Sequence, residues 1–130
     1  MKETLRWFGP KDSVSLKNIS QSGATGVVTS LDHIKTGSIW TLDEIEDRKK
    51  MIESFGLKWS VVESIPVHND IKTMSGNCEQ YVENYKKSVE NVGKSGINLV
   101  CYNFMAVFDW TRTNLKYELP NHSLALRFDM

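Results

Sequence analysis

The 130-residue sequence predicts an α/β fold: the N-terminal half of a (β/α)₈ TIM barrel, with about four parallel strands and three helices, followed by a C-terminal β-hairpin. Three observations lead to this prediction. Short apolar runs alternate with amphipathic segments, as in parallel sheets whose strands are joined by helical crossovers. The strand-like runs are almost continuously apolar, which is typical of strands covered on both faces. Two stretches, starting at Gly56 and Gly96, each lead from a helix-ending glycine into a strand.

The first half of the chain predicts two strands and two helices. Residues 5–8 form a short strand, residues 15–20 a brief helix, and the β-branched residues 26–31 a second strand. The stretch Thr41-Leu42-Asp43-Glu44 has the capping-box spacing of a helix start, and Gly56 ends that helix. The apolar face predicted for this helix consists of Leu42, Ile45, Ile52 and Phe55.

The second half repeats the pattern. Residues 59–67 are rich in Val, Ile and Trp and predict a third strand, with Pro66 near its end. Asn77 opens the next helix, Gly96 ends it, and residues 97–105 form the fourth strand. The buried stripe predicted for this helix follows helical spacing and consists of Cys78, Val82, Tyr85, Val89 and Val92.

The tail departs from the pattern. Residues 116–119 and 124–128 flank the turn 120–123 and predict a β-hairpin, with His122 at the surface. Residues 1–130 are expected to form one partial barrel domain, because a complete barrel needs about 250 residues. The outer edges of the first and fourth strands would then be unpaired, so a homo-oligomer or association through open sheet edges is expected. An open doubly wound sheet is less favoured, because residues 9–12 do not form its glycine-rich turn.

Composition excludes several classes of partner. Lysine plus arginine equals aspartate plus glutamate at 16 each, so no nucleic acid or anionic membrane partner is expected. The basic run Arg48-Lys49-Lys50 is interpreted as a solvated helix face. No apolar run approaches the ~20 residues of a membrane span, and the start is too polar for a signal peptide. Cys78 and Cys101 are interpreted as reduced thiols of a cytoplasmic protein without a structural zinc site.

Candidate site residues follow from the barrel geometry, because active sites of parallel barrels lie at the C-terminal ends of the strands. An arginine there can bind a carboxylate in bidentate geometry, while asparagine and histidine can bind hydroxyls. A tryptophan can form an apolar wall, so the set suits a polyhydroxylated acid. The sequence contains no catalytic triad, phosphate loop or metal-ligand spacing. The candidates are Trp7, Gly9, Ser30, His33, Glu63, Ser64, His68, Tyr102, Asn103, Asp109, Trp110 and Arg112.

Several candidates also have a structural interpretation. Glu63 could brace a loop or pair with a lysine, and His68 could hydrogen-bond only within its own loop. Asp109 and Arg112 could pair with each other. Asn103 is harder to explain in this way, because a polar amide inside an apolar run needs hydrogen-bond partners.

Two stretches resemble a known family. Residues 63–68, ESIPVH, and residues 101–113, CYNFMAVFDWTRT, are similar to mannonate dehydratases. Further similar segments lie along the whole chain, at residues 5–9, 26–29, 83–86, 117–120 and 125–129. The resemblance implies a barrel of the xylose-isomerase-like type. It also implies a hydro-lyase that removes water from D-mannonate, giving 2-keto-3-deoxy-D-gluconate in hexuronate breakdown.

The resemblance further implies a divalent metal, Mn²⁺ or Fe²⁺, that polarises the acid and its hydroxyls. A base would remove the C2 proton while an acid protonates the departing C3 hydroxyl. Family members are considerably longer and carry their metal ligands and acid–base residues on later strands, so neither is assigned within this chain. Ala106 stands where the family usually has proline. The residues that match family motifs and are predicted to bind substrate are Glu63, His68, Asn103, Trp110 and Arg112.

Three hypotheses for function follow. The first is a fragment of a mannonate dehydratase that is inactive as the isolated 130 residues. The second is a related metal-dependent sugar isomerase or epimerase, against which the run 103–113 argues. The third is an inert or self-associating half barrel. A Mn²⁺ titration separates the first hypothesis from the third, since a chain without ligands should show no specific Mn²⁺ uptake.

Overall fold

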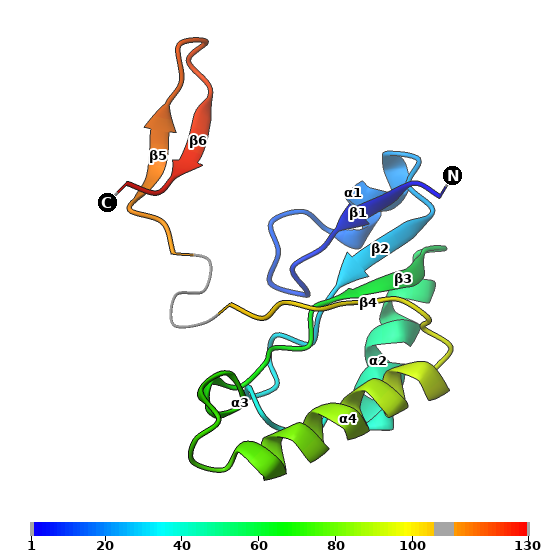
Figure 1. Ribbon diagram of the computed structural model, residues 1–130. Coiled ribbons are helices and arrows are strands. Elements are labelled where there is room, and N and C mark those ends of the chain that lie inside the picture. Colours follow the sequence, from blue (N-terminus) through cyan, green and yellow to red (C-terminus); the bar gives the residue numbers. More distant parts are fainter. Residues whose placement is uncertain (1, 106–110, 130) are drawn as a thin grey trace.

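The computed structural model describes residues 2–105 and 111–129. A four-stranded parallel sheet has the order β1-β2-β3-β4, and a separate antiparallel pair joins β5 to β6 (Figure 1). The predicted α/β class, with four parallel strands and a hairpin, is therefore confirmed. In chain order the elements are β1 (Thr4–Arg6), α1 (Leu16–Gln21), β2 (Gly26–Thr29), α2 (Leu42–Glu53), β3 (Lys58–Glu63), α3 (Asn69–Thr73), α4 (Cys78–Lys94), β4 (Val100–Cys101), β5 (Asn114–Glu118) and β6 (Leu124–Arg127).

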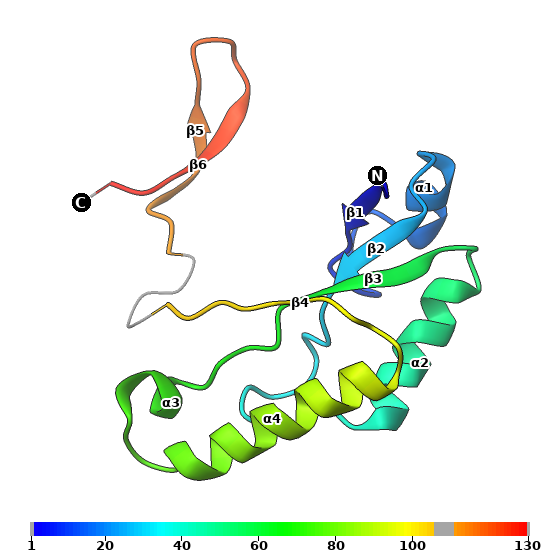
Figure 2. The same cartoon turned by 45° about the vertical axis from the view of Figure 1, so that its right-hand side comes forward.

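Within the residues that the structure describes, the parallel sheet has one face covered by helices and one bare face. Val27, Trp59 and Val62 are at most 2% exposed on the face that α2 and α4 cover (Figure 2). By strand alternation and register, the other face carries partly exposed side chains: Arg6, Val28, Val61, Glu63 and Cys101. Among the described residues the outer edges of β1 and β4 have no neighbouring strand. The sheet therefore has the geometry of an open barrel segment, with its helices outside.

The third and fourth strands are shorter than predicted. The third ends at Glu63 rather than at residue 67, and the fourth has only Val100 and Cys101 in the sheet rather than residues 97–105. An apolar run becomes a strand only where a neighbour pairs with it, and β4 is an edge strand with β3 alone beside it. The short helix α3, which was not predicted, fills part of the long connection that follows β3.

The buried face of α4 is rotated from the predicted stripe. Val89 is 38% exposed, whereas Ser88 is fully buried and Asn91 nearly so. The cause is a pair of hydrogen bonds to the loop before α2. The Trp40 amide donates to Ser88 Oγ at 2.9 Å, and Asn91 Nδ2 donates to the Trp40 carbonyl at 2.7 Å. Polar side chains that pair with a buried backbone thus lie on the buried face of α4, at positions outside the predicted apolar stripe.

The buried face of α2 also differs from the prediction. Ile45 and Ile52 are buried as expected, but Leu42 and Phe55 are about 40% exposed. Arg48, interpreted from the sequence as part of a solvated face, is only 7% exposed. The predicted start of this helix is confirmed, because Thr41 Oγ1 accepts a hydrogen bond from the Glu44 amide at 3.3 Å.

The hairpin forms where it was predicted. β5 and β6 are antiparallel, and the turn between them is closed by hydrogen bonds from the Leu119 amide to the Ser123 carbonyl and from the His122 amide to the Leu119 carbonyl. His122 lies at the surface, as expected. In the described part of the chain, no helix is long and apolar enough to cross a membrane. Both cysteines, Cys78 and Cys101, are free thiols.

Candidate functional site

The carboxyl ends of the four parallel strands meet along one edge of the sheet, where barrel active sites lie. Trp7 follows β1, Ser30 follows β2, Ser64 follows β3 and Asn103 follows β4. All four were predicted as candidates from the sequence. We call this row of residues the carboxyl edge.

Hydrogen bonds connect three of these strand ends. Ser30 Oγ donates to the Ser64 carbonyl at 2.8 Å, and Asn103 Nδ2 donates to Ser64 Oγ at 3.2 Å. An asparagine amide carries two N–H donors and one acceptor, so this contact uses only part of what the side chain can offer. Asn103 is therefore held at the strand ends by a hydrogen bond, as expected for a polar group in an apolar run.

Arg48 joins the carboxyl edge from α2 and was missed by sequence reasoning. Its Nη1 donates to the Ser30 carbonyl at 2.9 Å, and its guanidinium carbon lies 5.3 Å from the centre of the Trp7 ring. Burial lowers the pKa of Arg48, while the negative charges of Asp32 and Glu44 raise it. Its position in the sequence could have indicated that it is buried, since Ile45, Arg48 and Ile52 follow i, i+3, i+7 spacing on the core side of α2.

The loop after β1 is fixed around a single aspartate. The Asp12 carboxylate accepts hydrogen bonds from the Phe8 amide at 2.7 Å and the Val14 amide at 2.9 Å. These two backbone donors lower the pKa of Asp12. Gly9 has a φ of 91°, and a Cβ at this position would lie 3.4 Å from Arg48 Nη1. A glycine here provides both the positive φ and the close approach of the loop to the guanidinium.

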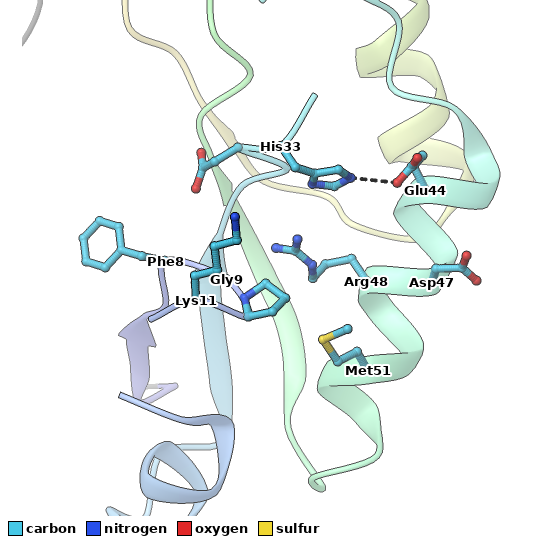
Figure 3. Close-up of a pocket in the computed structure, with 10 residues that line it drawn as sticks. Phe8, Gly9, Lys11, His33, Glu44, Asp47, Arg48 and Met51 are labelled. Atoms are coloured by element: carbon cyan, nitrogen blue, oxygen red, sulfur yellow. Dashed lines mark hydrogen bonds and ion pairs between the residues drawn. The ribbon is translucent and has the colours of Figure 1, made fainter. Parts of the chain in front are cut away.

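A hollow of about 440 Å³ lies between this loop, the loop after β2 and α2 (Figure 3). Arg48 points into it from α2, toward Gly9 and Lys11. His33 Nε2 lies 2.8 Å from Glu44 Oε2, so this predicted candidate contacts α2. With Asp32, Glu44 and Asp47 beside Lys11 and Arg48, the hollow carries charges of both signs. Its lining does not include Glu63, His68, Asn103 or Arg112, four of the five residues predicted to bind substrate.

Glu63 ends β3 on the bare face of the sheet, in register with Cys101. Within residues 2–105 and 111–129, no lysine or arginine nitrogen lies within 4.0 Å of its carboxylate. The alternative of a lysine partner is therefore not observed in the described structure. The side chain is partly exposed on the side that would face a barrel interior.

His68 has structural contacts. Its Nδ1 accepts a hydrogen bond from the Asp70 amide at 3.1 Å and caps α3, and its ring stacks on Tyr81 with centroids 3.8 Å apart. When Nδ1 is the acceptor, a neutral imidazole carries its hydrogen on Nε2. These contacts match the structural interpretation of His68, and Nε2 is the ring atom that could bind a ligand.

The last predicted residues are only partly described. Arg112 Nη1 donates to the Thr111 carbonyl at 2.8 Å. Asp109 and Trp110 lie outside the described residues. In the part of the chain that the structure covers, no group of three or more histidine, cysteine, aspartate or glutamate side chains could hold a metal ion. These residues therefore do not fit a resident divalent metal by themselves.

Comparisons with known proteins agree with one another. A family model described as D-mannonate dehydratase (UxuA) matches residues 1–130. A mannonate dehydratase from Saccharophagus degradans is 65% identical over 130 residues, which are 100% of this chain and 33% of the relative. One from Marinomonas sp. is 57% identical over 129 residues, 99% of this chain and 33% of the relative. The chain thus spans about a third of the length of these curated relatives.

A solved structure also matches this chain. The crystal structure of mannonate dehydratase from Streptococcus suis serotype 2 superposes with a TM-score of 0.92 at 49% sequence identity. The match covers 98% of this chain and 37% of that chain. Nearly the whole of this chain therefore resembles one part of that protein in both sequence and fold.

Proposed function

The chain belongs to the D-mannonate dehydratase family, and from this premise we propose that it forms part of a hydro-lyase that dehydrates D-mannonate. The product would be 2-keto-3-deoxy-D-gluconate, formed in cytoplasmic hexuronate catabolism. The observation that carries the proposal is the match of the whole chain to this family, with 65% identity to one relative. A sugar acid also suits the polar carboxyl edge, where Asn103 is held by Ser64.

Five residues are proposed to bind the substrate. The Arg112 guanidinium can take the carboxylate in bidentate geometry, and the Asn103 amide can bind a hydroxyl. Trp110 can cover the carbon chain. Glu63, on the bare face of the sheet, and His68, through Nε2, can each bind a hydroxyl. A divalent metal, Mn²⁺ or Fe²⁺, is proposed to be held by residues outside these 130, which leaves the isolated chain inactive.

The experiment compares the chain alone with a chimera. In the chimera, residues 1–130 replace the matching third of the Saccharophagus degradans relative, whose 65% identity favours compatible contacts. We expect the chimera to form the 2-keto product from D-mannonate with Mn²⁺, and the isolated chain to form none. A folded but inert chimera would contradict the proposed function. Turnover by the isolated chain would contradict the location of the metal ligands outside it.

A pair of asparagine variants of the chimera tests the pocket. Asn103→Ala removes a proposed substrate contact and is expected to raise KM about 3- to 10-fold, the effect of one lost hydrogen bond. Asn98→Ala is the matched control, because Asn98 is exposed in the segment before β4, at the opposite end of that strand from Asn103. Equal KM values for the two variants would remove Asn103 from the proposed pocket.

Association is proposed separately, from the open edges of the sheet. β1 and β4 end the sheet on either side in the described structure, and unpaired edges favour pairing with further strands. We expect the isolated chain to self-associate in size-exclusion chromatography with light scattering. A monomer at all concentrations would contradict this proposal and leave the family assignment unchanged.

A further inference from the structure

Among the residues that the structure describes, Arg48 is a buried cation without an ion pair. It is only 7% exposed, and no carboxylate oxygen of the described chain lies within 4.0 Å of its guanidinium. Removing an arginine charge from water costs free energy unless other contacts compensate. Since no salt bridge offsets this cost, the other contacts of Arg48 must account for the burial of its guanidinium.

The hydrogen bond and the ring contact of Arg48 both lie at the carboxyl edge. Nη1 donates to the Ser30 carbonyl at the end of β2 at 2.9 Å, and the guanidinium lies over the Trp7 ring at the end of β1. The Gly9 loop approaches the same guanidinium closely (Figure 3). One side chain of α2 thus contacts the ends of two strands and the loop after the first.

Ser30 carries the connection to the other two strands. Its hydroxyl donates to the Ser64 carbonyl after β3, and Ser64 Oγ accepts from Asn103 after β4. Trp7 is also tied to β2, because its carbonyl accepts from Thr29 Oγ1 at 2.6 Å. Arg48 is therefore the outer end of a continuous row of contacts that includes all four strand ends.

We infer that Arg48 is a positioning residue for the proposed dehydration: it holds the carboxyl edge, and through Ser30 and Ser64 the substrate-binding amide of Asn103, in place without touching the substrate. The inference rests on the proposed function. A planar guanidinium can donate to a carbonyl in its plane while its face covers an indole ring. A lysine ammonium is a point donor and cannot keep both contacts in the same geometry.

The test uses Arg48→Lys in the chimera with the Saccharophagus degradans relative. We expect kcat/KM for D-mannonate to fall about 10- to 100-fold, because a small displacement of positioning groups has effects of this size. The control is Ile52→Val, a buried change one turn further along α2 at a side chain that has no hydrogen-bonding group. Unchanged kcat/KM in Arg48→Lys, or an equal fall in Ile52→Val, would overturn the inference.

Chemical rescue distinguishes positioning from general loss of stability. In Arg48→Ala, added guanidinium ion at millimolar concentration can occupy the vacated space between Trp7 and Ser30. We expect it to recover at least about 3-fold in kcat/KM, the recovery that one regained hydrogen bond supplies. Methylammonium and sodium chloride at the same concentrations should recover none. Equal effects of all three salts would overturn the inference.

Hydrogen exchange keeps the inference separate from the proposed function. If the unsubstituted chimera is folded but does not dehydrate D-mannonate, the proposed function fails on its own. Amide exchange in peptides covering residues 28–31 and 62–64 should still be faster in Arg48→Lys than in Ile52→Val, because the Ser30–Ser64 contact is loosened. Identical exchange in both variants would show that Arg48 does not hold the carboxyl edge.

Discussion

The parallel sheet buries its apolar side chains, whereas the β5–β6 hairpin leaves its leucine side chains exposed. In the sheet, Val27 and Val62 are fully buried under the helices. In the hairpin, Leu115, Leu124 and Leu126 are each more than 60% exposed. Leucine and valine are both apolar, so side-chain type does not explain the difference. A crossover helix that returns over the sheet creates an interior, whereas a two-stranded ribbon pairs its backbone and has nothing to cover its faces.

The largest effect is expected at the centre of the sheet. Trp59 is 2% exposed in β3, and its Nε1 donates to the Val61 carbonyl at 3.0 Å. Trp59→Ala should lower the free energy of unfolding by about 3–5 kcal/mol, because it opens a cavity that neighbours fill poorly. Urea denaturation followed by circular dichroism measures this. A loss below about 1 kcal/mol would mean that the helices do not enclose the sheet as described.

An intermediate effect is expected where α4 meets the loop before α2. Asn91→Ala leaves the buried Trp40 carbonyl without its donor and should cost about 1–3 kcal/mol in the same assay. Val89→Ala is the control on the same helix, and its cost should stay below about 0.5 kcal/mol because Val89 is half-exposed. A larger cost for Val89→Ala than for Asn91→Ala would favour the apolar stripe predicted from the sequence over the buried face described here.

A smaller effect is expected in the hairpin. Leu126→Ala should change the free energy of unfolding by less than about 0.5 kcal/mol, since the side chain is 62% exposed. Val62→Ala, in the sheet, is the comparison. Because Leu126 is larger than Val62, a larger loss of stability in Val62→Ala than in Leu126→Ala reflects burial and not side-chain size. A cost above about 1 kcal/mol would show that the hairpin packs against another surface in the native protein.

The smallest effect belongs to the solvent face of α4. The hydrogen bond from Lys94, with a second from Lys87, lowers the pKa of Glu90 from 4.5 to about 2. Because the folded state favours the carboxylate, the stabilisation is complete above pH 4.5 and is lost as the pH falls toward 2. NMR titration of the Glu90 carboxyl measures the shift. It should shrink at about 1 M salt, where charges are screened within about 3 Å, and a shift independent of salt would contradict the ion-pair origin.

Local sequence signals were sufficient for most of the fold. The order of strands and helices, the Thr41 helix start and the hairpin follow from patterns that span only a few residues. Such patterns depend on backbone geometry and side-chain type, both of which are visible in one stretch of chain. The carboxyl-edge position of Ser30, Ser64 and Asn103 was also predictable, since parallel strands end at one edge.

The errors share one cause, which is pairing between distant segments. Ser88 and Asn91 are buried because the Trp40 backbone, about fifty residues earlier, needs partners. The fourth strand is short because pairing with β3 covers only Val100 and Cys101. Neither fact is encoded in the local pattern, because a hydrogen-bond partner has no signal in the segment that receives it.

The sequence by itself determined the α/β class, the element order and the family resemblance, because periodicity and motifs are properties of the chain. Only the tertiary structure decided which polar residues enter the interior. Arg48 shows the reason: by residue type an arginine belongs in water. Its burial depends on Trp7, Gly9 and Ser30, which folding brings to its guanidinium from two strand ends and a loop.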